Sequence, residues 1–218
     1  MIWMTLVTLL ACDKDGEIAD EPQILGSVAT ADAEADVAIY RAFGFHTNDG
    51  AMFYLTSTPD SDCPSVAKYL SSKQVDPEGI WAPGTCNLSA VLPDYDPAGM
   101  TVSRTADAPT TEVTWSVKCA LGEGAFDWGK RDEQSEDEDY FWAGDDAYEW
   151  IGNGKEFTVD FSGDGSPEDP YIVDIVEMTD FTGNYPTVLD TILADGSISG
   201  SIEAQACNDL YSAYIFPK

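Results

Sequence analysis

Short stretches in which apolar and polar residues alternate recur along most of the chain, and they limit the fold more than any other feature. Residues 156–162 show this best, because Phe157, Val159 and Phe161 alternate with small polar residues. A period of two is typical of a β-strand that buries one face. Gly, Pro and Asp separate these stretches. We therefore predict an all-β protein, an antiparallel β-sandwich or a barrel-like form of it, with about eight to ten strands, one short helix and long acidic loops.

The same alternation predicts three hairpins. The first runs over 37–45, turns at Asn48-Asp49-Gly50 and returns over 52–56. The second pairs residues 156–162 with 171–179. The third runs over 187–193, turns at Asp195-Gly196 and returns over 197–207.

Two further strands and the helix complete the predicted elements. We expect strands over 100–105 and 112–121, joined by a turn that contains Pro109. Residues 63–72 predict the helix, because Pro64 suits a first turn and the preceding Asp62 suits an N-cap.

The charge balance excludes two classes of partner. Asp and Glu number 40 against 10 Lys and Arg, so the formal net charge is −30. Nucleic acids and anionic bilayer surfaces are bound through clustered basic residues, and this chain offers none. Apolar residues nonetheless make up 44% of the sequence, which is enough to build a core.

The first eleven residues are uncharged and mainly apolar, and they lead directly to Cys12. A helix spans a bilayer with about 20 apolar residues, so this stretch fits the apolar region of a signal peptide better. Leu9-Leu10-Ala11-Cys12 resembles the lipobox of bacterial lipoproteins, and the chain is similar to secreted β-sandwich lipoproteins of that type. The resemblance implies that Cys12 is lipidated, becomes the first mature residue and anchors the chain to a membrane. It carries over no activity.

This resemblance divides the chain into three parts. Residues 1–11 form the signal peptide, 12–23 hold the lipidated Cys12 and an acidic tether, and 24–218 form one domain. The tether prediction rests on residues 13–22, which are rich in acids and have no apolar period.

Cysteine usage indicates the same compartment. Once Cys12 is set aside, four cysteines remain, an even number that suits two disulfides in an oxidising, extracytoplasmic space. Four cysteines allow three connectivities. We favour Cys63 with Cys207 and Cys86 with Cys119, because Cys63 follows one predicted core strand and Cys207 ends another. A zinc site is disfavoured, since no C-x-x-C pair is present.

Two acidic segments are candidate calcium sites, because calcium prefers oxygen ligands. Residues 132–149 are dense in carboxylates and aromatic rings, but they have no EF-hand spacing, so we favour a solvated loop. In the loop 163–170 the ligands would be Asp164, Glu168 and Asp169, although ordinary turn chemistry explains the same residues. We otherwise expect no cofactor.

Aromatic residues and the single histidine bear on function. Trp115 lies on a predicted strand and is expected in the core. Trp128, Trp142 and Trp150 lie in acidic loops and are candidate binding residues, although we favour a role in holding those loops to the domain. His46 precedes a turn, so we expect it to face solvent rather than serve a nucleophile.

These observations favour a non-enzymatic, lipid-anchored protein of the periplasm or cell surface, with a structural or interaction role. Its partner, a protein or a glycan, and its oligomeric state stay open. The alternative is a carbohydrate-binding module supported by calcium, or a glycoside hydrolase using two carboxylates. A carboxylate pair in a cleft beside an exposed Trp would favour hydrolysis, and carboxylates spread over a convex surface would favour the interaction role.

Overall fold

The computed structural model describes residues 21–31, 34–72, 86–105, 107–108, 113–120, 149–184 and 192–213. Ten strands and two short helices lie within these ranges. The N-terminal elements are β1 (Ile24–Ala29), β2 (Glu34–Ile39), β3 (Arg41–Thr47), β4 (Gly50–Thr56), α1 (Cys63–Ser72) and β5 (Cys86–Leu92). The C-terminal elements are β6 (Met100–Arg104), β7 (Thr114–Ala120), β8 (Glu149–Ser162), β9 (Tyr171–Asn184), β10 (Ile192–Ala206) and α2 (Leu210–Ala213). The all-β prediction is confirmed, with α2 as a second helix.

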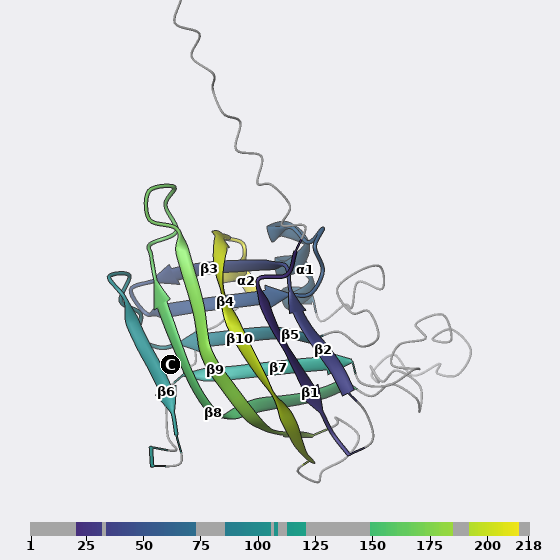
Figure 1. Ribbon diagram of the computed structural model, residues 1–218. Coiled ribbons are helices and arrows are strands. Elements are labelled where there is room, and N and C mark those ends of the chain that lie inside the picture. Colours follow the sequence, from purple (N-terminus) through teal and green to yellow (C-terminus); the bar gives the residue numbers. More distant parts are fainter. Residues whose placement is uncertain are drawn as a thin grey trace, which may run out of the picture.

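Seven of the strands close a barrel. The ring runs β10-β3-β4-β5-β7-β8-β9 and returns to β10, while β1 and β2 extend the sheet beside β10 and β6 extends it beside β8. Figure 1 shows the long strands β8, β9 and β10 in one layer and β3, β4, β5 and β7 crossing behind them. Every pairing is antiparallel except the short contact of β10 with β3.

The barrel closes because two long strands change partner along their length. β8 pairs with β7 over residues 149–152 and with β6 over 157–161. β10 pairs with β1 over residues 195–200 and with β3 at 205–206. Each long strand therefore belongs to both layers and forms a corner between them.

The second predicted hairpin is confirmed, but its strands are longer than the alternation indicates. Residues 156–162 pair with 172–179, within the longer strands β8 and β9. Phe157, Val159 and Phe161 are buried as predicted. The pairing continues from Glu156 back to Ile151 through Gly152 and Gly154, which interrupt the apolar alternation.

The first predicted hairpin is confirmed over β3 and β4, which turn at Asn48-Asp49. Residues 37–39 do not belong to it, because β2 ends at Ile39 and the Tyr40 N–H donates to the Thr56 carbonyl instead. The chain bends there from one layer into the other. This bend leaves no mark in the alternation.

The third predicted hairpin is wrong. β10 continues through Asp195-Gly196, and its pairing with β9 has an irregularity between Ala194 and Ser197. Gly196 has φ 141° and pairs with Val28 of β1. The glycine therefore marks a β-bulge inside a strand rather than a turn between two strands.

Two further strands form near their predicted positions, over 100–104 and 114–120. They do not pair with each other, because β6 pairs with β8 while β7 lies between β5 and β8. Pro109 lies outside the described residues. Trp115, on β7, is buried as predicted, and its ring stacks on Phe161 inside the barrel.

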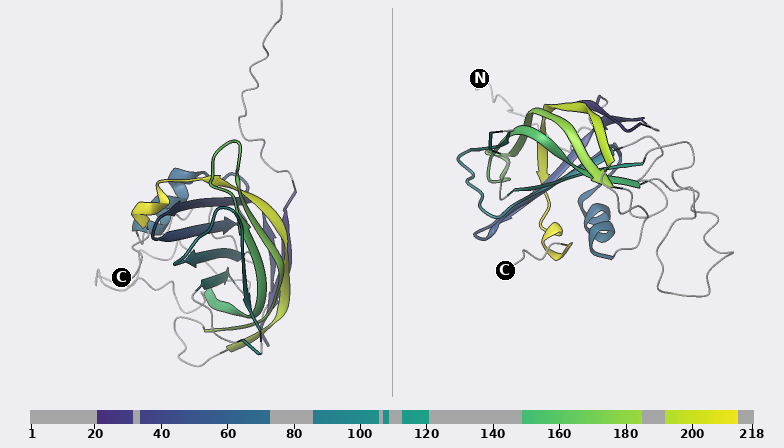
Figure 2. Two further views of the ribbon diagram at one scale, coloured as in Figure 1. Left: turned by 90° about the vertical axis from the view of Figure 1, so that its left-hand side faces the viewer. Right: turned by 90° about the horizontal axis from the view of Figure 1, so that it is seen from below.

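The helix α1 spans the predicted residues. The Asp62 carboxylate accepts from the Ser65 N–H at 2.9 Å, as an N-cap does. Together with α2, α1 covers the outer face of β3 and β4, as Figure 2 shows. A second, smaller core fills this contact, and it contains Phe43, Phe45, Met52, Tyr54, Val66, Ala67, Cys207 and Leu210. Because both faces of β4 are covered, all seven of its residues are buried.

Both favoured disulfides are confirmed. Cys63 and Cys207 join the start of α1 to the end of β10, across 144 residues of sequence. Cys86 and Cys119 occupy opposite positions on the paired strands β5 and β7. One bridge thus holds the helical cover on the barrel, and the other lies within its wall.

Candidate functional site

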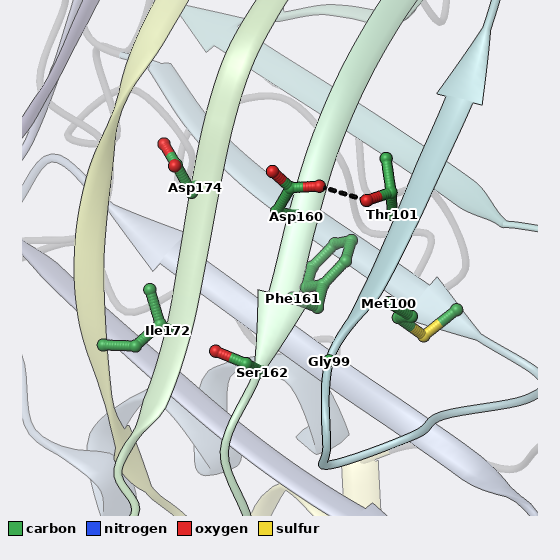
Figure 3. A pocket seen from close by; sticks show the side chains of 8 residues that line it. All are labelled: Gly99, Met100, Thr101, Asp160, Phe161, Ser162, Ile172 and Asp174. Carbon is green, nitrogen blue, oxygen red and sulfur yellow. Dashed lines mark hydrogen bonds between the residues drawn. The ribbon is translucent and has the colours of Figure 1, made fainter.

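A shallow hollow lies on the outer face of β6, β8 and β9, with a volume of about 310 Å³ (Figure 3). Its polar side chains are Thr101 of β6, Asp160 and Ser162 of β8, and Asp174 of β9. The Thr101 hydroxyl donates to Asp160 Oδ1 at 2.5 Å, which orients one carboxylate. This hollow brings together polar groups that lie up to 73 residues apart in sequence.

The two carboxylates of this hollow face each other across neighbouring strands, since Asp160 and Asp174 are register partners. Side chains in such positions have Cβ atoms about 5 Å apart, and like charges there disfavour pairing. The pair therefore lowers the stability of the hairpin and concentrates negative potential on the sheet face. It is suited to attract a cationic group.

A second hollow, of about 130 Å³, lies on the same sheet face near the other end of β6. It is lined by the carboxylates Glu156 and Glu177, by Arg104 and by neighbouring Thr side chains. The Arg104 Nε is buried and has no hydrogen-bond acceptor among the described residues. The guanidinium reduces the net negative charge of this hollow below that of the first.

Neither hollow has the surroundings of a glycosidase cleft. Both are open and lie on the convex outer face of the barrel, and the one aromatic side chain that lines each, Phe161 or Phe157, is buried in the core. Sugar-binding sites stack their ligand on exposed rings. Among the described residues, neither hollow places its carboxylates beside an exposed aromatic ring.

A polar cluster closes one end of the barrel around His46. The histidine lies on β3, half-buried, rather than facing solvent as the sequence predicts. Its Nδ1 and the Tyr171 hydroxyl are 2.7 Å apart, and the hydroxyl donates when this nitrogen carries no proton. The rings of Tyr95 and Phe53 pack on Tyr171, with centroids 6.3 and 5.5 Å away. The sequence did not reveal this cluster, because its residues come from three strands and from the loop between β5 and β6.

Hydrogen bonds join this cluster to the loop 163–170. The Tyr95 hydroxyl donates to the Gly163 carbonyl at 2.6 Å. Burial, followed by the nearby Tyr171 and the carboxylates of Asp169 and Asp164, raises the pKa of Tyr95. Burial also raises the pKa of Tyr171. Both phenols therefore stay protonated above the pH at which tyrosine usually ionises. Their hydroxyl groups act as hydrogen-bond donors at this end of the barrel.

The loop 163–170 is built as a turn. The Asp164 carboxylate accepts from the Ser166 N–H at 2.8 Å, and the Asp169 carbonyl accepts from the N–H groups of Asp164 and Gly165. Hydrogen bonds from Ser166 lower the pKa of Asp164. Within the described ranges, no group of three or more His, Cys, Asp or Glu side chains is arranged to hold a metal ion. Asp164 and Asp169, two of the three candidate calcium ligands, therefore make the hydrogen bonds of the turn.

The remaining predicted site residues lie mainly outside the described ranges. These are Cys12, Trp128 and Trp142, with the tether 13–20 and most of the acidic stretch 132–149. Trp150 lies on β8 opposite Cys119 of β7, and its side chain is not described.

The chain matches no known family model, no curated protein and no solved structure. In the described part of the chain, no helix is both long and apolar enough to cross a membrane. The geometry and the sequence motifs are thus the basis for a proposal about function.

Proposed function

We propose that this chain is a lipid-anchored lipoprotein of the bacterial cell envelope, held to a membrane by acylated Cys12 and acting by binding a partner. The observation that carries the proposal is Cys12 itself, placed directly after Leu9-Leu10-Ala11 at the end of an uncharged apolar stretch. More than one acyl chain on that cysteine is enough for stable anchoring.

The disulfides support an extracytoplasmic location. All four remaining cysteines are used in two bridges, and such bridges form and persist in oxidising compartments. Cys86, Cys119 and Cys207 are buried, so these bridges belong to the folded core. A domain built this way is suited to the periplasm or the cell surface.

The tether supports a domain that stands away from the bilayer. Residues 13–22 extend at most about 35 Å. Their acids keep the segment solvated, and the domain they carry is itself strongly acidic. The outer face of β6, β8 and β9 is then available to a partner, and its open hollows support an interaction role rather than catalysis.

Anchoring is tested by expressing the full chain and its Cys12→Ser variant in a bacterium that acylates lipoproteins. We expect the unmodified chain to partition into detergent and to carry the mass of acyl chains, while Cys12→Ser stays in the aqueous phase. The variant is a matched control, because it replaces the sulfur atom of Cys12 by oxygen and leaves the net charge unchanged.

A chain that partitions into the aqueous phase without added mass would overturn the anchor. Alkylation under non-reducing conditions tests the compartment separately, since four reactive thiols in the unreduced protein would contradict an oxidising location.

A further inference from the structure

Among the described strands, β6 is the last one of the sheet, with its second edge unpaired. Among the described residues it pairs only with β8, and Figures 1 and 2 show it at the margin of the layer. Its residues, Met100 to Arg104, include no carboxylate and no proline. Soluble proteins usually protect open edges with charges, prolines or bulges. The opposite edge, β2, carries the exposed acids Glu34 and Asp36, whereas the one charged residue of β6 is Arg104, at its end.

The open side of β6 offers backbone hydrogen-bonding groups. In an antiparallel ladder, alternate residues direct their N–H and C=O groups to opposite sides, so part of the backbone of β6 points away from β8. No backbone group of residues 100–104 bonds elsewhere within the described ranges. An extended peptide is the ligand that such an edge binds, by strand addition.

The two acidic hollows lie beside the two ends of this strand. Thr101 lines the first hollow and Arg104 the second. Asp160 and Glu156, the carboxylates of the two hollows on β8, are four residues apart and lie on the same face, so they are about 13 Å apart along the strand. On an added strand, two side chains four residues apart match this spacing and face the same side.

We propose that the open edge of β6 binds an extended segment of a partner protein by strand addition, and that this segment carries Lys or Arg at two positions four residues apart. The inference rests on the proposed interaction role and names its partner class. Asp160 of β8 would bind one cation and Glu156 of β8 the other, while Asp174 and Glu177, one strand further from the edge, add to the negative potential. Because Arg104 lies in the second hollow, the first contributes more to selectivity.

Charge favours a basic partner over a second copy of the chain. Two copies would each bring a net charge of −30, and long-range repulsion would oppose the approach of edge to edge. A basic segment is instead attracted, and its long side chains reach over the small Thr101 and Ser103 to the carboxylates of β8.

The test measures binding of a fluorescent peptide, Thr-Lys-Val-Thr-Val-Lys-Val, to the full chain in mild detergent. We expect saturable binding that weakens with added salt. Asp160→Asn with Asp174→Asn should weaken it by about fivefold, the factor that corresponds to about 1 kcal/mol for an exposed ion pair. The matched control is Asp36→Asn, which removes one carboxylate from the other edge and should leave affinity unchanged.

Backbone pairing is tested with the same peptide carrying N-methyl groups at alternate residues, which removes donors but keeps the charge. We expect this peptide to lose binding, and Thr101→Lys, an exposed substitution on the edge, to do the same. Equal binding of the methylated peptide, or equal weakening by Asp36→Asn, would overturn strand addition at β6. A dimer of the free chain that Thr101→Lys dissociates would overturn it in favour of self-pairing.

The same titration with Cys12→Ser separates this inference from the anchor. Unchanged peptide affinity in that variant is expected whether or not Cys12 is acylated. Loss of binding in Cys12→Ser alone would contradict a site that lies on β6.

Discussion

At the scale of single residues, three glycines allow β1 to lie against β10. Gly26, Gly196 and Gly200 all lie where these strands pair. A Cβ at Gly26 would meet the carbonyl oxygen of Ser197, and one at Gly196 would meet that of Ser27. These contacts involve backbone atoms, which do not move aside as a side chain can. The close approach of the two backbones therefore depends on the missing side chains.

We expect Gly26→Ala to destabilise the domain by about 1–3 kcal/mol, the usual cost of an atom forced into a packed contact. Ser27→Ala is the matched control, since Ser27 lies on the other face of β1 and is half-buried. Urea unfolding followed by tryptophan fluorescence measures both. Equal midpoints for the two variants would contradict this account of the glycine.

The half-buried phenol of Tyr95 makes stability depend on alkaline pH. Its pKa in the folded chain is raised by burial, while in the unfolded chain it titrates near the usual value of about 10. The folded state then holds the proton more tightly, so the contribution is complete below about pH 10 and is lost as pH rises above it.

We expect Tyr95→Phe to be less stable at neutral pH by about 1 kcal/mol, because the hydrogen bond to Gly163 is lost. Above about pH 10 the two stability curves should converge, since phenylalanine does not ionise. Thermal melts at stepped pH measure this, with the exposed Tyr211→Phe as control. Parallel curves to high pH would show that Tyr95 is not the group responsible.

At the scale of elements, the attachment of α1 depends on its disulfide and on the small outer core. Cys63 begins α1, and its partner Cys207 directly follows β10. In the loop-entropy model, this bridge stabilises the domain by about 5 kcal/mol, against about 4 kcal/mol for Cys86 with Cys119. The two bridges therefore stabilise the domain by similar free energies, but they hold different elements in place.

Replacing Cys63 and Cys207 by Ala should loosen α1 before the barrel. We expect hydrogen exchange of the α1 amides, Val66 among them, to become faster while β5 stays protected. Replacing Cys86 and Cys119 by Ala should instead lower protection in β5 and β7. Uniform loss of protection in both variants would mean that helix and barrel unfold as one unit.

The first hollow depends on how β6, β8 and β9 pair, which the alternation of apolar and polar residues does not reveal. Asp160 falls on the polar face of residues 156–162, as the alternation predicts. Asp160 and Asp174 lie at equal distances in sequence on either side of Pro167. A hairpin that turns about Pro167 therefore places them opposite each other. Thr101 could not be placed there, because the pairing of β6 with β8 crosses 59 residues of sequence.

At the scale of the whole molecule, the charge of −30 opposes folding through self-repulsion. Salt screens this repulsion, and the Debye length falls from about 30 Å at 0.01 M to about 3 Å at 1 M. We expect stability to rise by about 1 kcal/mol with added NaCl, or about 3 °C in Tm for a chain of this size. Differential scanning fluorimetry measures the shift.

Calcium chloride at equal ionic strength provides the control. A matching shift would indicate screening alone, and a larger one would indicate calcium bound to the carboxylates. A Tm that is unchanged in both salts would contradict the role given to repulsion.

The class of fold, the helix over 63–72 and the core-facing residues of β8 could be predicted from the sequence, because they follow from local periods of two and from the capping of one turn. The continuity of β10, the division of β2 from β3, the contact of His46 with Tyr171 and that of Thr101 with Asp160 required the folded chain. These features depend on bends and pairings between distant strands. A local pattern records which face of a strand is buried, but not which strand lies beside it.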